Sequence, residues 1–322
     1  MRITDSILWA VCAVASISFI LIPLTNDVRI FFGAAHIAAS FYPFPQGVDL
    51  AWELKPIFNR IIFYALYKLA TLVTPMSNWD LFGVVVKSVC LIPVFGISRF
   101  FARSVKVKNA FFLCYLSFVT VGIWGSIQAE WWGCLIAVAA IALFLRNTAI
   151  CAGSAGACIV LLFFLKGITV LLVFPILAAV YLLDEFAFFE RQNSFWAGAA
   201  IAFLPFVVAA FTIWPYMIPD MQMISAVAKI GAYGIFERLL FFLEWLFISW
   251  IWIPALLPGF IVGIWLFFSR IRYYPLITRI AYEVLWIVPI VIVIVTGELF
   301  GYHYLVFIPS VIVSSILAVK LS

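Results

Sequence analysis

The chain has 322 residues, of which 67% are hydrophobic and 10% are charged, and its mean hydropathy is +1.22. Soluble domains carry about 25% charged residues, so this composition excludes a soluble globular protein and predicts an integral membrane protein. The net charge of +5 is then a topology signal and gives no indication of nucleic-acid binding.

The apolar segments predict an all-α, polytopic transmembrane bundle of about ten spans with additional interfacial helices. Segments of about 16 to 20 apolar residues, separated by short polar breaks, have the length of membrane-spanning helices. No stretch has the composition of a soluble domain, so we expect a single transmembrane domain over residues 1–322. In chain order the expected spans are 6–23, 80–98, 109–126, 131–146, 148–165, 168–183, 195–214, 252–269, 280–297 and 303–319.

A long polar interruption follows the first span, between Thr25 and Arg60. Beyond it, the apolar stretch 56–75 carries polar residues at helical spacing. They form one stripe: Arg60, Tyr64, Tyr67, Lys68 and Thr71. A stripe with two cations favours a helix that lies in the membrane interface over one that crosses it.

The distribution of Lys and Arg supports a non-spanning 56–75 segment, because cytoplasmic loops carry an excess of these residues. With that topology, eleven of the nineteen fall inside: Arg2, Arg99, Arg103, Lys106, Lys108, Arg146, Arg191, Arg270, Arg272, Arg279 and Lys320. Asp184, Glu185 and Glu190 predict a solvated cytoplasmic loop. Seven cations fall outside, as if around an anion: Arg29, Lys55, Arg60, Lys68, Lys166, Lys229 and Arg238.

Carboxylates share the outer side with these cations. They are Asp27, Asp49, Glu53, Glu130 and Glu298, and the stretch GYHYL adds Tyr302, His303 and Tyr304. A carboxylate ringed by cations can take a proton from a hydroxyl while the cations hold a phosphate. The alternative is that these groups cap helices, extend to the interface or pair with one another.

Four motifs, in order along the chain, resemble the GT-C superfamily of membrane glycosyltransferases. They are NDVRIFFGAA, WELKPIF, FFLKGITVLLVFP and GYHYLVFIPS. The first resembles the family's catalytic acid in the first outer loop. The others resemble its Lys-Pro stretch, its Lys-Gly at the outer end of a middle span and its late His-Tyr-Leu element. The chain departs from the family in having one proline after Lys55, no paired-acid metal motif in the first loop and no C-terminal soluble domain.

The resemblance implies a sugar transfer from a polyprenyl phosphate to a glycan, lipid or protein acceptor at the outer face, without metal or cofactor. Asp27 would be the general base. The lipid phosphate would be held by Arg29, Lys55, Lys166 and His303, with Arg60 behind them. The sugar or acceptor would be contacted by Glu53, Glu130, Trp131, Tyr302 and Tyr304.

Two other classes of function stay open at this stage. A transporter or flippase of lipid-linked sugars would use the same cations, but it needs polar residues along several spans, and here Lys87 is nearly alone within a span. A polysaccharide polymerase or ligase also has large outer loops, with a lipid-diphosphate donor. His36 is expected to be only a residue of a polar stripe.

Overall fold

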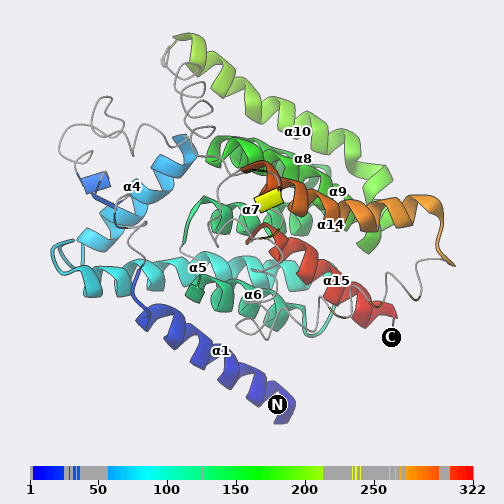
Figure 1. The fold of residues 1–322 in the computed structure, drawn as a ribbon. Helices are drawn as coiled ribbons and strands as arrows, with labels where there is room; N and C mark the ends of the chain where they lie inside the picture. Colours follow the sequence, from blue (N-terminus) through cyan, green and yellow to red (C-terminus); the bar gives the residue numbers. More distant parts are fainter. Residues whose placement is uncertain are drawn as a thin grey trace.

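The structure is a computed structural model that describes residues 3–24, 29, 32–33, 35–36, 57–124, 127–212, 234, 236–237, 240, 261, 265, 269, 273–296 and 305–321. All regular secondary structure in these ranges is helical (Figure 1). The predicted all-α class is therefore confirmed for this part of the chain.

The helices begin and end close to the boundaries that hydropathy predicts. They are α1 Ile3–Leu21, α4 Ile57–Thr71, α5 Trp79–Val105, α6 Ala110–Trp124, α7 Ala129–Phe144, α8 Ala149–Leu165, the 3-10 helix η1 Gly167–Leu172, α9 Val173–Leu183, α10 Glu185–Thr212, α14 Leu276–Thr296 and α15 Ile308–Leu321. The expected span 252–269 lies almost wholly outside the described residues.

Asp184, Glu185 and Glu190 are exposed, as expected, but the prediction of a loop is wrong, because α10 begins at Glu185 and continues without a break to Thr212. The Asp184 carboxylate accepts a hydrogen bond from the backbone N–H of Ala187 at 3.0 Å, as a helix N-cap does. Acidic residues are favourable in a first helical turn, so this polar stretch is a helix start.

Helices that follow one another in the chain alternate in direction, so the bundle has two distinct ends. At one end α1, α6 and α8 finish while α5 and α7 begin, and we call it the Lys166 end. Its cross-contacts include Lys87 with the carbonyl of Ile22, and the Trp131 indole N–H, which donates to the carbonyl of Phe118 at 3.1 Å. At the opposite Lys108 end, Lys108 lies 3.5 Å from Asp5.

The cations predicted to be cytoplasmic gather at the Lys108 end. Those in the described part are Arg99, Arg103, Lys106, Lys108, Arg146, Arg191, Arg279 and Lys320. Two of them join helix ends there: Lys320 donates to the carbonyl of Leu183 at 3.3 Å, and Arg191 donates to the carbonyl of Arg146 at 3.0 Å. The segregation of charge that the sequence predicts is thus present in the fold.

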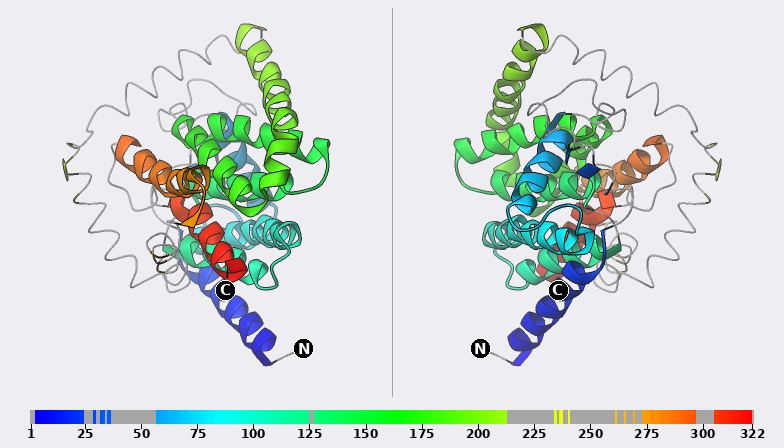
Figure 2. Two further views of the ribbon diagram at one scale, coloured as in Figure 1. Left: turned by 90° about the vertical axis from the view of Figure 1, so that its right-hand side faces the viewer. Right: turned by 90° about the vertical axis from the view of Figure 1, so that its left-hand side faces the viewer.

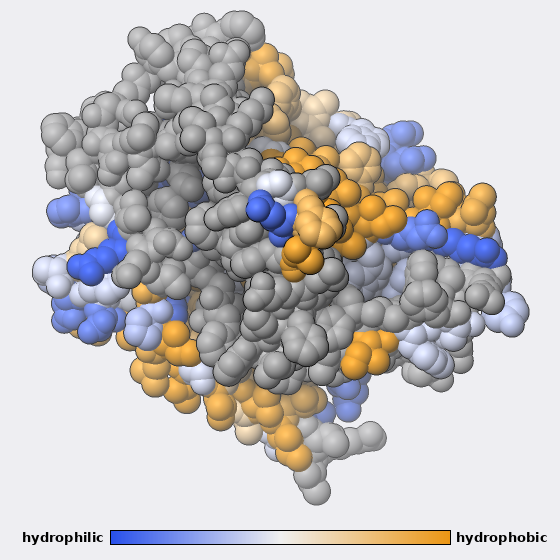
Figure 3. Space-filling model, viewed as in Figure 1, coloured by the Kyte–Doolittle hydropathy of each residue, from blue (hydrophilic) through white to orange (hydrophobic). Residues whose placement is uncertain are grey.

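One contiguous apolar core joins the helices from α1 to α15. The surface is apolar as well. The described part contains two helices, α5 and α14, that are long and apolar enough to cross a bilayer; α6, α7, α8 and α15 are apolar but shorter. Figure 3 shows hydrophobic side chains over α1 and α14, with hydrophilic ones gathered towards the left and right edges.

Helix α10 extends beyond the bundle on one side and α1 on the other (Figure 2). Where α10 meets α8, the two helices run parallel and their backbones touch through glycines. A Cβ on Gly156 would overlap the carbonyl oxygen of Phe195 and lie 2.8 Å from the nitrogen of Ala199. A Cβ on Gly198 would overlap the carbonyl of Gly153. Small residues that let helix backbones approach closely are characteristic of packing in membranes.

This contact predicts that Gly156→Ala and Gly198→Ala each lower the stability of the protein by about 1–3 kcal/mol, the usual cost of overpacking. Thermal unfolding in detergent measures the effect. Gly96→Ala in α5 is the matched control, because no atom lies within 4 Å of its added Cβ. That variant should be as stable as the wild type or more so, since alanine favours helix. A Gly156→Ala protein that melts at the wild-type temperature would contradict the packing.

Candidate functional site

The described residues among those predicted for the site all lie at the Lys166 end, in helices or directly beside them. They are Arg29, Arg60, Glu130, Trp131 and Lys166. The other predicted residues lie outside the described part of the chain. They are Asp27, Glu53, Lys55, Tyr302, His303 and Tyr304.

Glu130 and Lys166 form an ion pair in which the Lys166 ammonium donates to Oε1 of Glu130. They meet because the loop between α7 and α8 is short, which places the first turn of α7 beside the last residue of α8. Glu130 is 3% exposed and is the only buried carboxylate among the described residues, while the Lys166 side chain is 28% exposed. The pair therefore has a buried acidic side and a solvent-accessible basic side.

The backbone around Lys166 is fixed by Thr169. The Thr169 hydroxyl donates to the carbonyls of Leu162 and Lys166, both at 2.7 Å, and the Thr169 N–H also donates to Lys166 at 2.7 Å. These bonds satisfy carbonyls that the end of α8 leaves without helical partners. Lys166 is thereby held in an extended conformation at the junction of α8 and η1.

Trp131 does not fit the predicted contact with a sugar, because its ring is fully buried. It stacks on Phe19 of α1, with ring centroids 6.4 Å apart and planes 13° apart, and meets Phe118 edge-on. The neighbouring Trp132 is half-buried, and its Nε1 has no hydrogen-bond partner in the described structure. The same holds for Nε2 of Gln128. Two unused donors thus lie within two residues of Glu130 along the chain.

Lys87 lies about two turns inside α5, as predicted, and it is directed towards the end of α1. Its ammonium donates to the carbonyl of Ile22 and lies 5.3 Å from the centroid of the Phe19 ring. The side chain is 3% exposed. Lys87 therefore bonds a neighbouring backbone carbonyl, and it fixes the point at which the chain leaves α1.

The expected polar stripe of α4 differs in exposure from one edge to the other. Arg60 is buried at 6% exposure, whereas Lys68 is exposed with its ammonium 5.5 Å from the ring of Tyr64. Phe63, which lies beside Arg60 on the helix, meets Phe32 edge-on at 5.3 Å, so this edge of the stripe packs into the bundle. The stripe therefore has a buried edge at Arg60 and Tyr67 and an exposed edge at Lys68.

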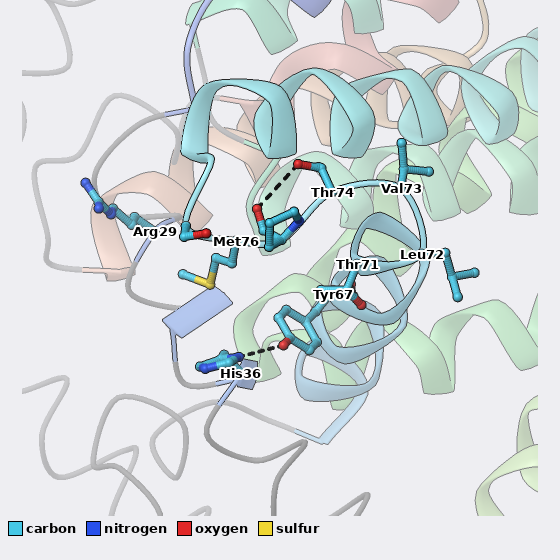
Figure 4. Close-up of a pocket in the computed structure, with 10 residues that line it drawn as sticks. Arg29, His36, Tyr67, Thr71, Leu72, Val73, Thr74 and Met76 are labelled. Atoms are coloured by element: carbon cyan, nitrogen blue, oxygen red, sulfur yellow. Dashed lines mark hydrogen bonds between the residues drawn. The ribbon is translucent and has the colours of Figure 1, made fainter.

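An open pocket of about 670 Å³ lies where α4 ends and α5 begins. Figure 4 shows Arg29, Met76 and His36 along one side and, along the other, Tyr67 and Thr71 of α4 with Leu72, which follows the helix. Nδ1 of His36 is 2.6 Å from the hydroxyl of Tyr67. The volume is within the range of small-molecule sites. Arg29 is exposed, with its guanidinium 5.3 Å from the centroid of Trp79.

Sequence reasoning missed two features of this end of the bundle. It treated His36 as a stripe residue, whereas His36 lines the pocket; no local motif marks it, because Tyr67 lies thirty-one residues away. The sequence-based prediction also assigned Glu130 and Lys166 to separate ligands. The short connection between α7 and α8 could have indicated that the start of α7 and the end of α8 lie together. The Lys166 end therefore contains cations that can bind an anion, and it contains one buried carboxylate, that of Glu130.

The ion pair predicts an asymmetric response to substitution. Lys166→Met leaves the buried Glu130 carboxylate without its ammonium, whereas Glu130→Gln leaves an ammonium that water can reach. Lys166→Met should therefore lower the free energy of unfolding more than Glu130→Gln does. The loss in the double variant should be smaller than the sum of the two single losses by about 1–3 kcal/mol.

Chemical unfolding of the four proteins in detergent measures this coupling energy. Lys166→Arg, which keeps the charge, is the control and should be the least damaging change at this position. Additive effects, or a Glu130→Gln protein less stable than Lys166→Met, would contradict the pairing.

Comparisons with protein-family models, curated proteins and solved structures find no match to this chain. Its function is therefore inferred from the chemistry of the Lys166 end and from the sequence motifs.

Proposed function

We propose that this protein is a multi-pass membrane glycosyltransferase that moves one sugar from a polyprenyl phosphate to an acceptor hydroxyl on the extracytoplasmic face. One observation carries the proposal: three of the four buried charges of the described bundle lie at its Lys166 end, where two further cations are partly or fully exposed. The three buried charges are those of Arg60, Lys87 and Glu130, and the two further cations are Lys166 and Arg29.

A membrane location is supported by large apolar side chains that face outward along the helices. Examples are Val14 of α1, Ile201 of α10 and Leu276 of α14, which are 65%, 72% and 71% exposed. In a bilayer this surface would contact lipid. The proposal keeps about ten spans, of which α5 and α14 have the required length within the described part.

The orientation follows from the cations at the Lys108 end. Because Lys and Arg concentrate on the cytoplasmic side of membrane proteins, that end would be inside and the Lys166 end outside. Helix α4 supports this arrangement. Its last turn carries the exposed cation Lys68, and Tyr67 packs on Phe82 in the first turn of α5.

The reaction we propose is an in-line displacement. The acceptor oxygen attacks the anomeric carbon while the bond from that carbon to the phosphate oxygen breaks, and the electron pair stays on the phosphate. The acceptor proton passes to Asp27, and the configuration of the sugar inverts. Charge on the lipid phosphate grows from one towards two, so cations aimed at it stabilise the transition state more than the ground state.

The residues proposed to hold that phosphate are Lys166 and Arg29, with Lys55 and His303 from the motifs of the resemblance. An ammonium carries three hydrogens, so Lys166 can keep its bond to Glu130 and still bind a phosphate oxygen from its exposed side. Glu130 would hold the ammonium in place. This is the role that the structure supports best for it, in preference to a direct contact with the acceptor.

A flippase or transporter of lipid-linked sugars is the second candidate, and the distribution of buried charge speaks against it. A substrate path would need polar side chains through the middle of the bundle. Within the described helices, the fourth buried charge is Arg191 at the Lys108 end, where it donates to the carbonyls of Phe144 and Arg146. Between the two ends the described core is otherwise apolar or carries hydroxyls.

The test offers purified full-length protein in vesicles a panel of radiolabelled polyprenyl-phosphate sugars and polyprenyl-diphosphate sugars, with and without chelator. We expect a sugar-bearing product from a monophosphate donor, unaffected by chelator. Asp27→Asn should lower the rate by about 10² to 10⁴, the usual contribution of a general base. Lys55→Ala and Lys166→Ala should raise the KM for the donor.

Lys68→Ala is the matched control, because it removes an exposed cation from the same end and should leave the KM unchanged. Near-normal transfer by Asp27→Asn would remove the proposed base. Transfer only from diphosphate donors would indicate a polymerase or ligase, and exchange of intact lipid-linked sugar across the vesicle without product would indicate a flippase.

A further inference from the structure

The pocket between α4 and α5 is lined by both polar and apolar side chains. Leu72 and Val73 at its edge are 81% and 68% exposed, and Pro75 and Met76 continue the apolar side. Its polar lining includes Arg29, and no carboxylate lines it in the described part of the chain. A ligand that matches these walls has an anionic group joined to a hydrocarbon chain.

Two groups can hold the anion. Among the described residues Arg29 has no carboxylate partner, and its position over the Trp79 ring leaves its N–H groups available at the edge. His36 uses Nδ1 with Tyr67, and Nε2 has no partner in the described structure. When the tyrosine hydroxyl donates to Nδ1, the ring hydrogen is on Nε2, which is then a hydrogen-bond donor.

The helix ends beside the pocket do not oppose an anion. The last carbonyls of α4 would repel it, but several are already engaged. The Thr71 hydroxyl bonds the carbonyls of Tyr67 and Lys68, both at 3.0 Å, and the N–H groups of Val73 and Thr74 bond the carbonyl of Ala70. The start of α5, whose amide groups favour an anion, lies on the other side, next to Ser77.

We propose that this pocket binds the phosphate-bearing head of the lipid donor, with Arg29 and His36 as contact residues and Tyr67 as a positioning residue for His36. The inference rests on the proposed function for the identity of the lipid as an isoprenoid phosphate. Leu72 and Val73 would contact the first part of its chain, where the chain enters the membrane.

Direct binding tests the pocket without requiring any sugar transfer. Farnesyl phosphate is titrated into the full-length protein in detergent, and its dissociation constant is measured by calorimetry. Farnesol, inorganic phosphate and dihexanoyl phosphatidylglycerol are titrated in parallel. We expect farnesyl phosphate to bind at least about tenfold more tightly than each of the three, because only it presents both a phosphate monoester and an isoprenoid chain.

The variants assign the binding to this pocket. Arg29→Met and His36→Phe should each lower the affinity for farnesyl phosphate about ten- to a hundredfold, as expected for the loss of a charge-assisted hydrogen bond. Tyr67→Phe keeps the ring contact with Phe82, so its melting temperature should be unchanged, and it should lower the affinity for farnesyl phosphate about three- to tenfold. Lys68→Met, an equal loss of charge outside the pocket, should bind as the wild type does.

The proposal is overturned if Arg29→Met and His36→Phe bind farnesyl phosphate normally, or if farnesol, inorganic phosphate or the phosphatidylglycerol binds as tightly. These results are separable from a failure of the proposed function. If the protein binds farnesyl phosphate selectively but transfers sugar from no donor, the pocket is supported and the proposed enzymatic function is contradicted. If the protein transfers sugar but the Arg29→Met and His36→Phe variants bind farnesyl phosphate normally, the enzymatic function is supported and the pocket is contradicted.

Discussion

Glu130 and Lys166 meet because α7 and α8 form an antiparallel hairpin, and this ion pair is the point around which one end of the bundle is arranged. The next residue, Trp131, stacks on Phe19 of α1, and Lys87 lies over the same Phe19 ring while it holds the carbonyl of Ile22. One turn further along α7, the thiol of Cys134 donates to the carbonyl of Leu305 at 2.9 Å, just before α15. Segments far apart in sequence are thus tied to the first two turns of α7.

The cost of burying charge explains why the ends of the bundle differ from its middle. A charge in an apolar environment is stable only when it is paired or hydrogen-bonded. Lys87 finds a helix-terminal carbonyl, Glu130 finds an ammonium and Arg191 finds the terminal carbonyls of α7. Such partners are available where helices end, and that is where the described buried charges of α5, α7 and α10 lie. This pattern fits a protein whose chemistry takes place at one face.

The sequence predicts helix positions well because long apolar runs admit only one secondary structure in a membrane. It fails where the local signal is ambiguous. Acidic residues at 184–190 read as a loop, although Asp184 is an N-cap and Glu185 begins a helix. It cannot predict that Trp131 turns inward while Trp132 remains half-buried, since that depends on the position of Phe19. The pocket that His36 shares with Tyr67 depends on the packing of α4, which no short motif encodes.

The proposed sugar transfer requires the Lys166 end to face the outside of the cell. The most direct measurement is labelling of single cysteines, in a protein whose native cysteines are replaced, with a membrane-impermeant maleimide on intact cells. A cysteine at exposed Lys68 in α4 should be labelled without permeabilisation, and one at exposed Asn109, before α6, only after it. The reverse pattern, or equal labelling of both, would place the charged site on the wrong side for an extracytoplasmic transferase and would contradict the account.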